Sequence, residues 1–164
     1  MTAFTPIAFI DTFDLVASLP PHLGLFRPTE TGERVLPLRG PRKDAEETFA
    51  WYKPYGRWVE AKNMLGQLQR IGDAHLGSIE FGQVFLEMLD PGVTLRWDWT
   101  APTSFARGHL PLRTNPLARM YAGTETAHLL PGQLTIVSGG PQCAINLGSW
   151  PRVHLVCDFR KKDS

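Results

Sequence analysis

Two strands and a tight turn are predicted by the stretch QVFLEMLDPGVTLRWD, residues 83–98. Apolar and polar residues alternate through Val93–Asp98, and a period of two is typical of strands with one buried face. The short, mainly apolar run Gln83–Leu89 before it also predicts a strand. Asp90-Pro91-Gly92 between them favours a tight turn, because Pro presets one backbone angle and Gly accepts conformations closed to other residues. Val93–Asp98 is therefore expected to be the returning strand.

The same pattern of short strands, broken by Pro and Gly, continues to the end of the sequence. The front part differs: Asp11 can cap a short helix over Thr12–Leu19, and the spacing of apolar residues from Met64 to Ile71 predicts an amphipathic helix over Glu60–Asp73. This order indicates an all-β sandwich or barrel with helices gathered at the front. Further strands are expected at Arg34–Leu38, Ala106–Leu112, Leu117–Tyr121, Thr126–Leu130, Gln133–Val137, Cys143–Leu147 and Val153–Asp158.

Length and composition indicate a single domain over residues 1–164. Hydrophobic residues make up 43% of the chain, and the formal net charge of +1 gives no bulk attraction to nucleic acid or to an anionic membrane. No apolar run is long enough to span a membrane, and Met1–Leu15 lacks the basic start of a secretory signal. Cys143 and Cys157 fit neither a metal motif nor a disulfide framework, so we expect two buried free thiols and a cytoplasmic protein.

Three of the predicted strands carry an arginine two residues before an aspartate or a histidine. Residues at i and i+2 share one face of a strand, and Glu87 in the same way shares a face with Gln83 and Phe85. These faces either point to solvent or converge into a polar pocket, and arginines in a partly dry pocket favour a carboxylate or phosphate partner. The pairs are Arg96 with Asp98, Arg107 with His109, and Arg152 with His154.

Several short motifs between Glu87 and Asp158 have a recognisable order and spacing. They are Pro91-Gly92, Arg107-Gly108-His109-Leu110-Pro111-Leu112, Thr114-Asn115-Pro116, Pro131-Gly132-Gln133-Leu134, and Pro141-Gln142 with Asn146 and Arg152. This part of the chain, less than half of it, resembles the aspartyl/asparaginyl β-hydroxylase family and its free-proline hydroxylase relatives, which use Fe(II) and 2-oxoglutarate. The resemblance implies a mainly β fold: a double-stranded β-helix (jelly-roll, cupin-like) over residues 81–160, with the helices of residues 1–75 packed outside it.

The resemblance also implies that the oxidative centre is lost. The positions of the family's two iron-binding histidines hold Asp98 and Gln142, and a carboxylate with an amide makes a weak oxygen site for Fe(II). The positions that bind anions are kept. Arg152 matches the arginine that binds the distal carboxylate of 2-oxoglutarate, and Arg107 and His109 match the pair that contacts substrate and cosubstrate.

Two of the acidic residues also have a structural interpretation. As an ion pair with Arg96 or Arg107, Asp98 would simply neutralise a position that holds metal in the family. Glu87 falls near a small polar contact to 2-oxoglutarate, where a carboxylate repels the dianion unless it is protonated or paired with an arginine.

Three functions stay open. The favoured one is a metal-independent acid/base enzyme (isomerase, cyclase, lyase or hydrolase) that binds a carboxylated small molecule and needs no cofactor. The alternatives are an Fe(II)/2-oxoglutarate-dependent hydroxylase of an amino acid or related carboxylate with unusual ligands, and a non-catalytic carboxylate-binding protein. We expect no nucleic-acid or membrane partner, and a homodimer stays open. The expected catalytic residues are Asp98, His109 and Glu87, and the expected substrate-binding residues are Arg107, Arg152, Arg96, His154, Gln142 and Trp97.

Overall fold

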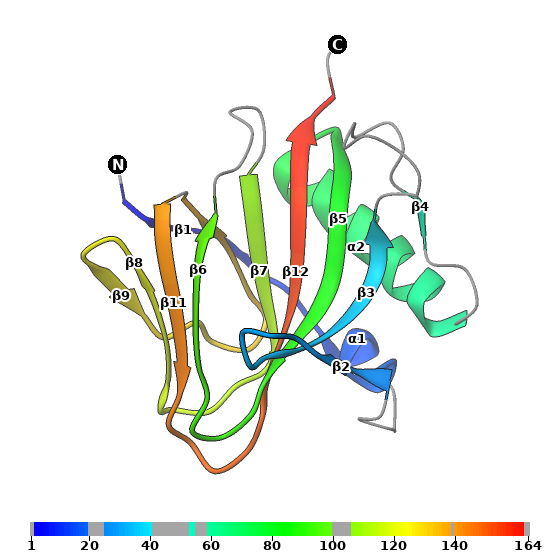
Figure 1. Cartoon of the computed structure of the whole chain (residues 1–164). Helices are drawn as coiled ribbons and strands as arrows, with labels where there is room; N and C mark the ends of the chain where they lie inside the picture. Colours follow the sequence, from blue (N-terminus) through cyan, green and yellow to red (C-terminus); the bar gives the residue numbers. More distant parts are fainter. Residues whose placement is uncertain are drawn as a thin grey trace.

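The computed structural model describes residues 2–19, 25–40, 53–54, 59–99, 106–138 and 140–162. Two antiparallel sheets make up most of it, and the helices pack beside the larger sheet (Figure 1). The helices are α1 (Phe13–Ala17) and α2 (Val59–Leu76). The strands are β1 (Phe4–Phe9), β2 (Arg27–Pro28), β3 (Arg34–Gly40), β4 (Lys53–Pro54), β5 (Ile79–Leu89), β6 (Thr94–Trp99), β7 (Ala106–Arg113), β8 (Ala118–Ala122), β9 (Glu125–Ala127), β10 (Gln133–Val137), β11 (Gly140–Asn146) and β12 (Arg152–Lys161).

From β5 onward the chain passes back and forth between the two sheets, as in a double-stranded β-helix. The large sheet has the order β1-β10-β7-β12-β5-β3-β2, with β4 beside β3, and the small sheet has the order β6-β11-β8-β9. The predicted returning strand therefore does not pair with the strand before it, because β6 pairs with β11 whereas β5 pairs with β12 and β3. The turn lies at the predicted place, with Gly92 at φ +80°, but it carries the chain from one sheet to the other.

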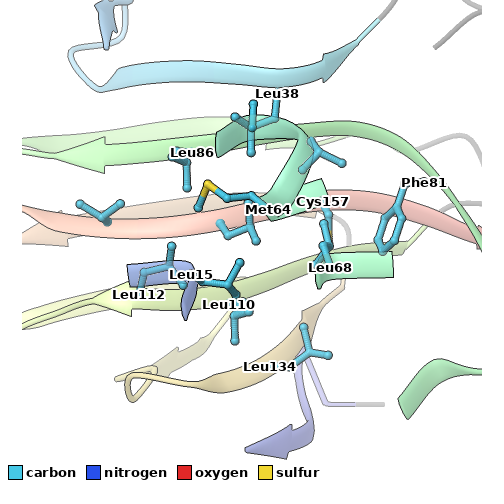
Figure 2. Close-up of a cluster of buried hydrophobic side chains, with 14 of the residues drawn as sticks. Leu15, Leu38, Met64, Leu68, Phe81, Leu86, Leu110, Leu112, Leu134 and Cys157 are labelled. Atoms are coloured by element: carbon cyan, nitrogen blue, oxygen red, sulfur yellow. The ribbon is translucent and has the colours of Figure 1, made fainter. Parts of the chain in front are cut away.

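Apolar side chains bind the helices to the outer face of the large sheet. Met64 and Leu68 of α2 and Leu15 of α1 are at most 2% exposed. Figure 2 shows these three side chains packed against the strands, so burial of apolar surface holds the helices outside the β-structure. The strands contribute Leu38, Phe81, Leu86, Leu110, Leu112, Leu134 and Cys157 to this contact.

The helices differ slightly from the prediction. The first is shorter: it spans Phe13–Ala17 with Thr12 at the N-cap position, while the carboxylate of Asp11 accepts a hydrogen bond from the Phe13 N–H at 3.0 Å. The second extends to Leu76, and Gly77 follows it at φ +83°, a conformation that ends a helix. Among the described residues, no helix is both long and apolar enough to cross a membrane.

The two thiols are not equivalent, contrary to the expectation that both are buried. Cys157 is buried in the apolar core, and this burial, with the nearby charge of Asp158, raises the pKa of its thiol to about 12. Cys143 is only partly buried.

A second apolar cluster fills part of the space between the sheets. Leu89 and Val137 of the large sheet pack there against Leu95, Met120 and Ala144 of the small sheet. The same inner face of the large sheet continues as a group of buried polar side chains. The interior of the jelly-roll is therefore apolar in one part and polar in another.

Candidate functional site between the sheets

The polar faces of β5, β7 and β12 converge on the inside of the molecule. Directly opposed residues of antiparallel strands share a face, and the pairs are His154 with Glu87, Val156 with His109, and Asp158 with Arg107. Arg152 is opposite Leu89, which packs against the small sheet, so this face is the inner one. We call Glu87, Arg107, His109, Arg152, His154 and Asp158 the inner polar cluster.

Arg152 is the centre of this cluster and is only 1% exposed. Its Nη1 donates to the Glu87 carboxylate at 2.8 Å, and its Nε donates to His154 Nε2 at 3.0 Å. Nη2 lies 2.9 Å from His154 Nδ1. Each nitrogen of the guanidinium lies within 3.0 Å of Glu87 or His154, and because a neutral imidazole accepts at only one nitrogen, one of the two His154 contacts is a hydrogen bond. The charge-assisted contact with Glu87 holds Arg152 in place.

His109 is completely buried but has no comparable set of partners. Neither of its ring nitrogens is hydrogen-bonded to any described residue, although buried polar atoms are normally paired. Its ring packs edge to face on His154, with 5.8 Å between the ring centroids. Burial, assisted by the positive charges of Arg152 and Arg107, lowers the pKa of His109 well below its usual value, so the imidazole is neutral.

His154 is also buried and neutral. Burial lowers its pKa well below the usual value, and the guanidinium of Arg152, in direct contact with the ring, acts in the same direction. Because the ring nitrogens of His154 are held against Arg152, this imidazole serves as a polar support for the arginine.

A second ion pair lies on the same face of the sheet. Arg107 donates from Nε and Nη2 to the two oxygens of Asp158, at 2.7 and 2.9 Å, and its guanidinium lies 5.8 Å above the centre of the Phe85 ring. The side chains are 12% and 15% exposed, so this pair is less buried than the pair of Arg152 and Glu87. Each arginine of the cluster thus has a carboxylate partner among the described residues.

Four of the expected site residues, Arg96, Trp97, Asp98 and Gln142, lie on the small sheet, and the two that match the family's iron positions are Asp98 and Gln142. Gln142 is buried and donates to the Ser138 carbonyl at 3.0 Å, while its Oε1 has no partner among the described residues. In the strand register Gln142 is opposite Trp97, and Asp98 is opposite Pro141. Asp98 and Gln142 are therefore not directly opposite each other in the pairing of β6 with β11, but are offset by one residue. The side chains at positions 97–99 lie outside the described part of the chain.

Arg96 does not join the cluster. It is exposed and lies opposite Cys143, which is in turn opposite the exposed Tyr121 on β8. Alternation along β6 does not tell which of its two faces is buried. Leu95, the residue before Arg96, packs between the sheets, and the side chain of Asp98 lies outside the described part of the chain.

Several residues that support the site were not singled out by the sequence. Asp158 and Thr135 lie on the inner face, the latter opposite His109. Asn115 and Asn146 form a buried amide pair at 2.8 Å, and Asn146 also donates to the carbonyls of Leu89 and Trp150. These bonds hold the connection that leads into Arg152. The only signal in the sequence was the presence of both asparagines in the motifs around residues 114–116 and 141–146.

The described residues do not by themselves form a site for iron, and the side chain of Asp98, one of the two positions matched to iron ligands, lies outside them. No three His, Cys, Asp or Glu side chains among them are grouped as a metal site. Arg152, the residue matched to 2-oxoglutarate binding, is already engaged by Glu87 and His154. A dianion at this place would also meet the negative charge of Glu87.

Comparison with solved structures identifies the class of fold. The chain is similar to a prolyl-4-hydroxylase from Pseudomonas putida, with a TM-score of 0.61 and 15% identity over 98% of this chain and 94% of that one. It is also similar to an oxidoreductase of the 2OG-Fe(II) oxygenase family from Burkholderia pseudomallei, with a TM-score of 0.65 and 10% identity over 92% and 78% of the two chains. No protein-family model and no curated protein sequence matches the chain. The predicted mainly β, jelly-roll fold is confirmed.

Proposed function

We propose that this protein is a small-molecule enzyme that uses an oxygenase-like jelly-roll for metal-independent acid/base chemistry on a carboxylated substrate. The observation that carries this proposal is His109, a fully buried imidazole whose two nitrogens have no partner among the described residues. Its neutral form can accept a proton, which is the first requirement of a general base.

The surroundings of His109 suit a reaction in which negative charge develops on the substrate. Arg152 and Arg107 both act on the ring electrostatically, and both are held in place by ion pairs. Fixed positive charges in a dry interior stabilise a developing anion without having to reorient. We assign His109 to proton transfer and the arginines to charge stabilisation near the carboxylated substrate.

Glu87 has a different role in this proposal. Its carboxylate is 2.8 Å from Arg152 Nη1 and is committed to that ion pair. We therefore assign it to positioning Arg152. Asp98 remains a candidate second acid or base.

Exchange of carbon-bound hydrogen tests the proposal for every reaction that begins with removal of a proton from carbon. The protein is incubated in D₂O with 2-oxo acids, 2-hydroxy acids and amino acids. NMR follows loss of the proton signal at C3 of the oxo acids and at C2 of the other two classes, against protein-free controls. Catalysed exchange with one of these classes is expected. His109→Gln should slow it by about 10²- to 10⁴-fold, the usual contribution of a positioned proton-transfer group.

His75→Gln is the matched control, because His75 is exposed near the end of α2. This variant should exchange at the wild-type rate. Exchange that survives in a folded His109→Gln protein would remove His109 from the mechanism. Absence of exchange with all three classes would contradict abstraction of a proton from a carbon next to the ketone or the carboxylate.

A further inference from the structure

Exposed apolar side chains gather at one end of the β-structure. At this end the chain leaves β7 and β11 and enters β8 and β12, and α1 begins after β1 (Figure 1). Exposed hydrophobic residues that are scattered singly are common, whereas a group of them marks an interaction surface. Six of the eight large exposed hydrophobics among the described residues lie here: Phe9, Phe13, Leu117, Leu130, Leu147 and Trp150.

Three of these residues, Leu117, Leu147 and Trp150, form what we call the Trp150 patch. The Leu147 N–H donates to the Leu117 carbonyl at 3.4 Å, and the indole of Trp150 donates to the Thr114 carbonyl at 3.1 Å. These bonds hold the connection between β7 and β8 beside the connection between β11 and β12. The three side chains are between 47% and 61% exposed, so they present apolar surface to solvent.

The other three residues, Phe9, Phe13 and Leu130, form what we call the Phe13 patch. Phe9 is opposite Gln133 in the pairing of β1 with β10, and the Leu130 N–H donates to the Gln133 side chain at 3.1 Å. Phe13 is the first residue of α1, shortly after β1. Its side chain is 76% exposed and that of Phe9 is 68% exposed, which makes them the two most exposed large hydrophobics of the described chain.

The last residues of β7 connect the two patches. The Gly132 N–H, in the turn after Leu130, donates to the Pro111 carbonyl of β7 at 2.9 Å. Shortly after Pro111, the carbonyl of Thr114 accepts the hydrogen bond from Trp150. The two patches therefore border each other across the end of β7 and form one apolar surface.

Charged side chains of opposite sign flank the two patches. Asp11 and Asp14, beside the Phe13 patch, are exposed. Arg113 and Arg119 belong to the other side: Arg113 precedes the residue that binds the Trp150 indole, and Arg119 follows Leu117 on β8. None of these four side chains forms an ion pair with a described residue. The surface thus has an acidic side and a basic side.

We infer that this end of the molecule is the contact between two copies of the chain. In a two-fold contact both copies use the same surface, so the Trp150 patch of each copy can cover the Phe13 patch of the other. The basic side of one copy then faces the acidic side of the other, twice over. Burial of the aromatic side chains stabilises such a contact, and the opposite charges fix its orientation. An anionic membrane fits less well, because Asp11 and Asp14 would face its negative charge.

Sedimentation equilibrium of the full chain tests the inference. We expect twice the mass of the chain between micromolar and millimolar concentration. Phe13→Ser and Leu147→Ser each remove an exposed apolar side chain and should raise the dissociation constant about tenfold or more without loss of fold. Tyr121→Ser is the matched control, because it removes an aromatic side chain that is 40% exposed but lies farther along β8. This variant should dimerise like the wild type.

Reversal of single charges tests the orientation of the two copies. Asp14→Arg or Arg119→Asp would place like charges opposite each other and should raise the dissociation constant about tenfold. The double variant restores opposite charges and should recover most of the affinity. Lys161→Glu is the matched control, since Lys161 is exposed at the far end of β12.

Three results would overturn the inference. The first is a monomeric wild type over the whole concentration range, including one that floats with vesicles of phosphatidylcholine and phosphatidylserine, which would make the surface a membrane contact. The second is a dimer that survives both Phe13→Ser and Leu147→Ser, which would place the contact elsewhere. The third is a charge-reversed double variant that dimerises no better than the single variants. None of these results involves His109, so the proposed function is tested separately.

Discussion

Arg152 and Glu87 form a buried ion pair in which each charge depends on the other to remain in the interior. Replacing a buried pair by apolar residues is often tolerated, whereas removing one partner leaves a buried charge uncompensated. Since Arg152 is 1% exposed, water cannot take the place of the lost carboxylate. The pair therefore fixes the arrangement of β5 and β12 more than it adds to overall stability.

Glu87→Ala should lower the free energy of unfolding by about 3–5 kcal/mol, because it leaves the buried Arg152 charge without its ion-pair partner. Glu87→Gln keeps a hydrogen-bond acceptor and should cost less. Glu80→Ala is the matched control on the same strand, since the pair of Glu80 and Arg160 is 31% and 38% exposed and should contribute less than about 1 kcal/mol. Urea unfolding of the three variants measures these differences. Equal losses from Glu87→Ala and Glu80→Ala would contradict the account of Arg152.

The two buried histidines predict that the protein becomes less stable below neutral pH. Their folded-state pKa values lie below the usual value, so the unfolded chain binds more protons and stability falls as the pH falls through about 6.5. At pH 5.5 each histidine should cost on the order of 1 kcal/mol relative to pH 7.5. Urea unfolding at these two pH values is the measurement. His109→Gln should reduce the difference, and an unchanged difference would show that His109 does not titrate as described.

Much of this cluster could be predicted from spacing alone. Residues two apart share one face of a strand, so the spacing predicts that Arg107 lies beside His109 and Arg152 beside His154. The structure brings both pairs together with Glu87. The partners could not be predicted. Strand pairing between β12 and its neighbours, which no local pattern encodes, decides that Arg152 is neutralised by Glu87 and Arg107 by Asp158.

Helix α2 contains two glycines in opposite environments. Gly66 is exposed, and the nearest side-chain atom to an added Cβ is Arg70 Nη1 at 3.9 Å. Gly72 is buried against β5, and a Cβ there would lie 2.5 Å from Ile79 Cδ1 and 3.1 Å from Phe81 Cζ. The missing side chain at Gly72 lets the helix approach the sheet closely, whereas Gly66 has no such role.

Gly66→Ala should therefore raise the free energy of unfolding by about 0.5–1 kcal/mol through helix propensity. Gly72→Ala gains the same propensity but must displace packed core side chains, so a net loss of about 1–2 kcal/mol is expected. Thermal and urea unfolding of the two variants compares them directly. Stabilisation by both substitutions would mean that the packing of α2 on β5 accommodates an added methyl group without loss of stability.

The turn at Asp90-Pro91-Gly92 shows what local sequence can and cannot determine. Its position and both flanking strands could be predicted, but the pairing could not, because a turn of this length can join two strands of one sheet or of two facing sheets. The choice depends on β11 and β12, which come more than forty residues later and pair with β6 and β5 respectively. Strand partners in a jelly-roll are set by the whole chain.

The molecule as a whole combines an oxygenase-like fold with an interior in which the described residues form two buried or half-buried ion pairs. The apolar half of the interior resembles an ordinary sandwich core, with Leu89 and Val137 packed on the small sheet. The polar half is closed by its own ion pairs. We propose that such an interior favours chemistry by its own side chains over chemistry by a dianionic cosubstrate, because the dianion would have to displace Glu87 from Arg152.

Exposure of the whole protein to iron and 2-oxoglutarate tests this preference. Fe(II) prefers imidazole together with carboxylate ligands, and Gln142 offers a weakly basic amide at a position that the resemblance assigns to iron. Protein purified from iron-supplemented medium should hold far less than one iron per chain, and a chelator should leave its melting temperature unchanged. Added Fe(II) and 2-oxoglutarate should release no succinate above a protein-free control. One tightly held iron per chain, with succinate release that stops on Arg152→Ala, would instead establish an oxygenase with unusual ligands and show that 2-oxoglutarate displaces Glu87 from its arginine.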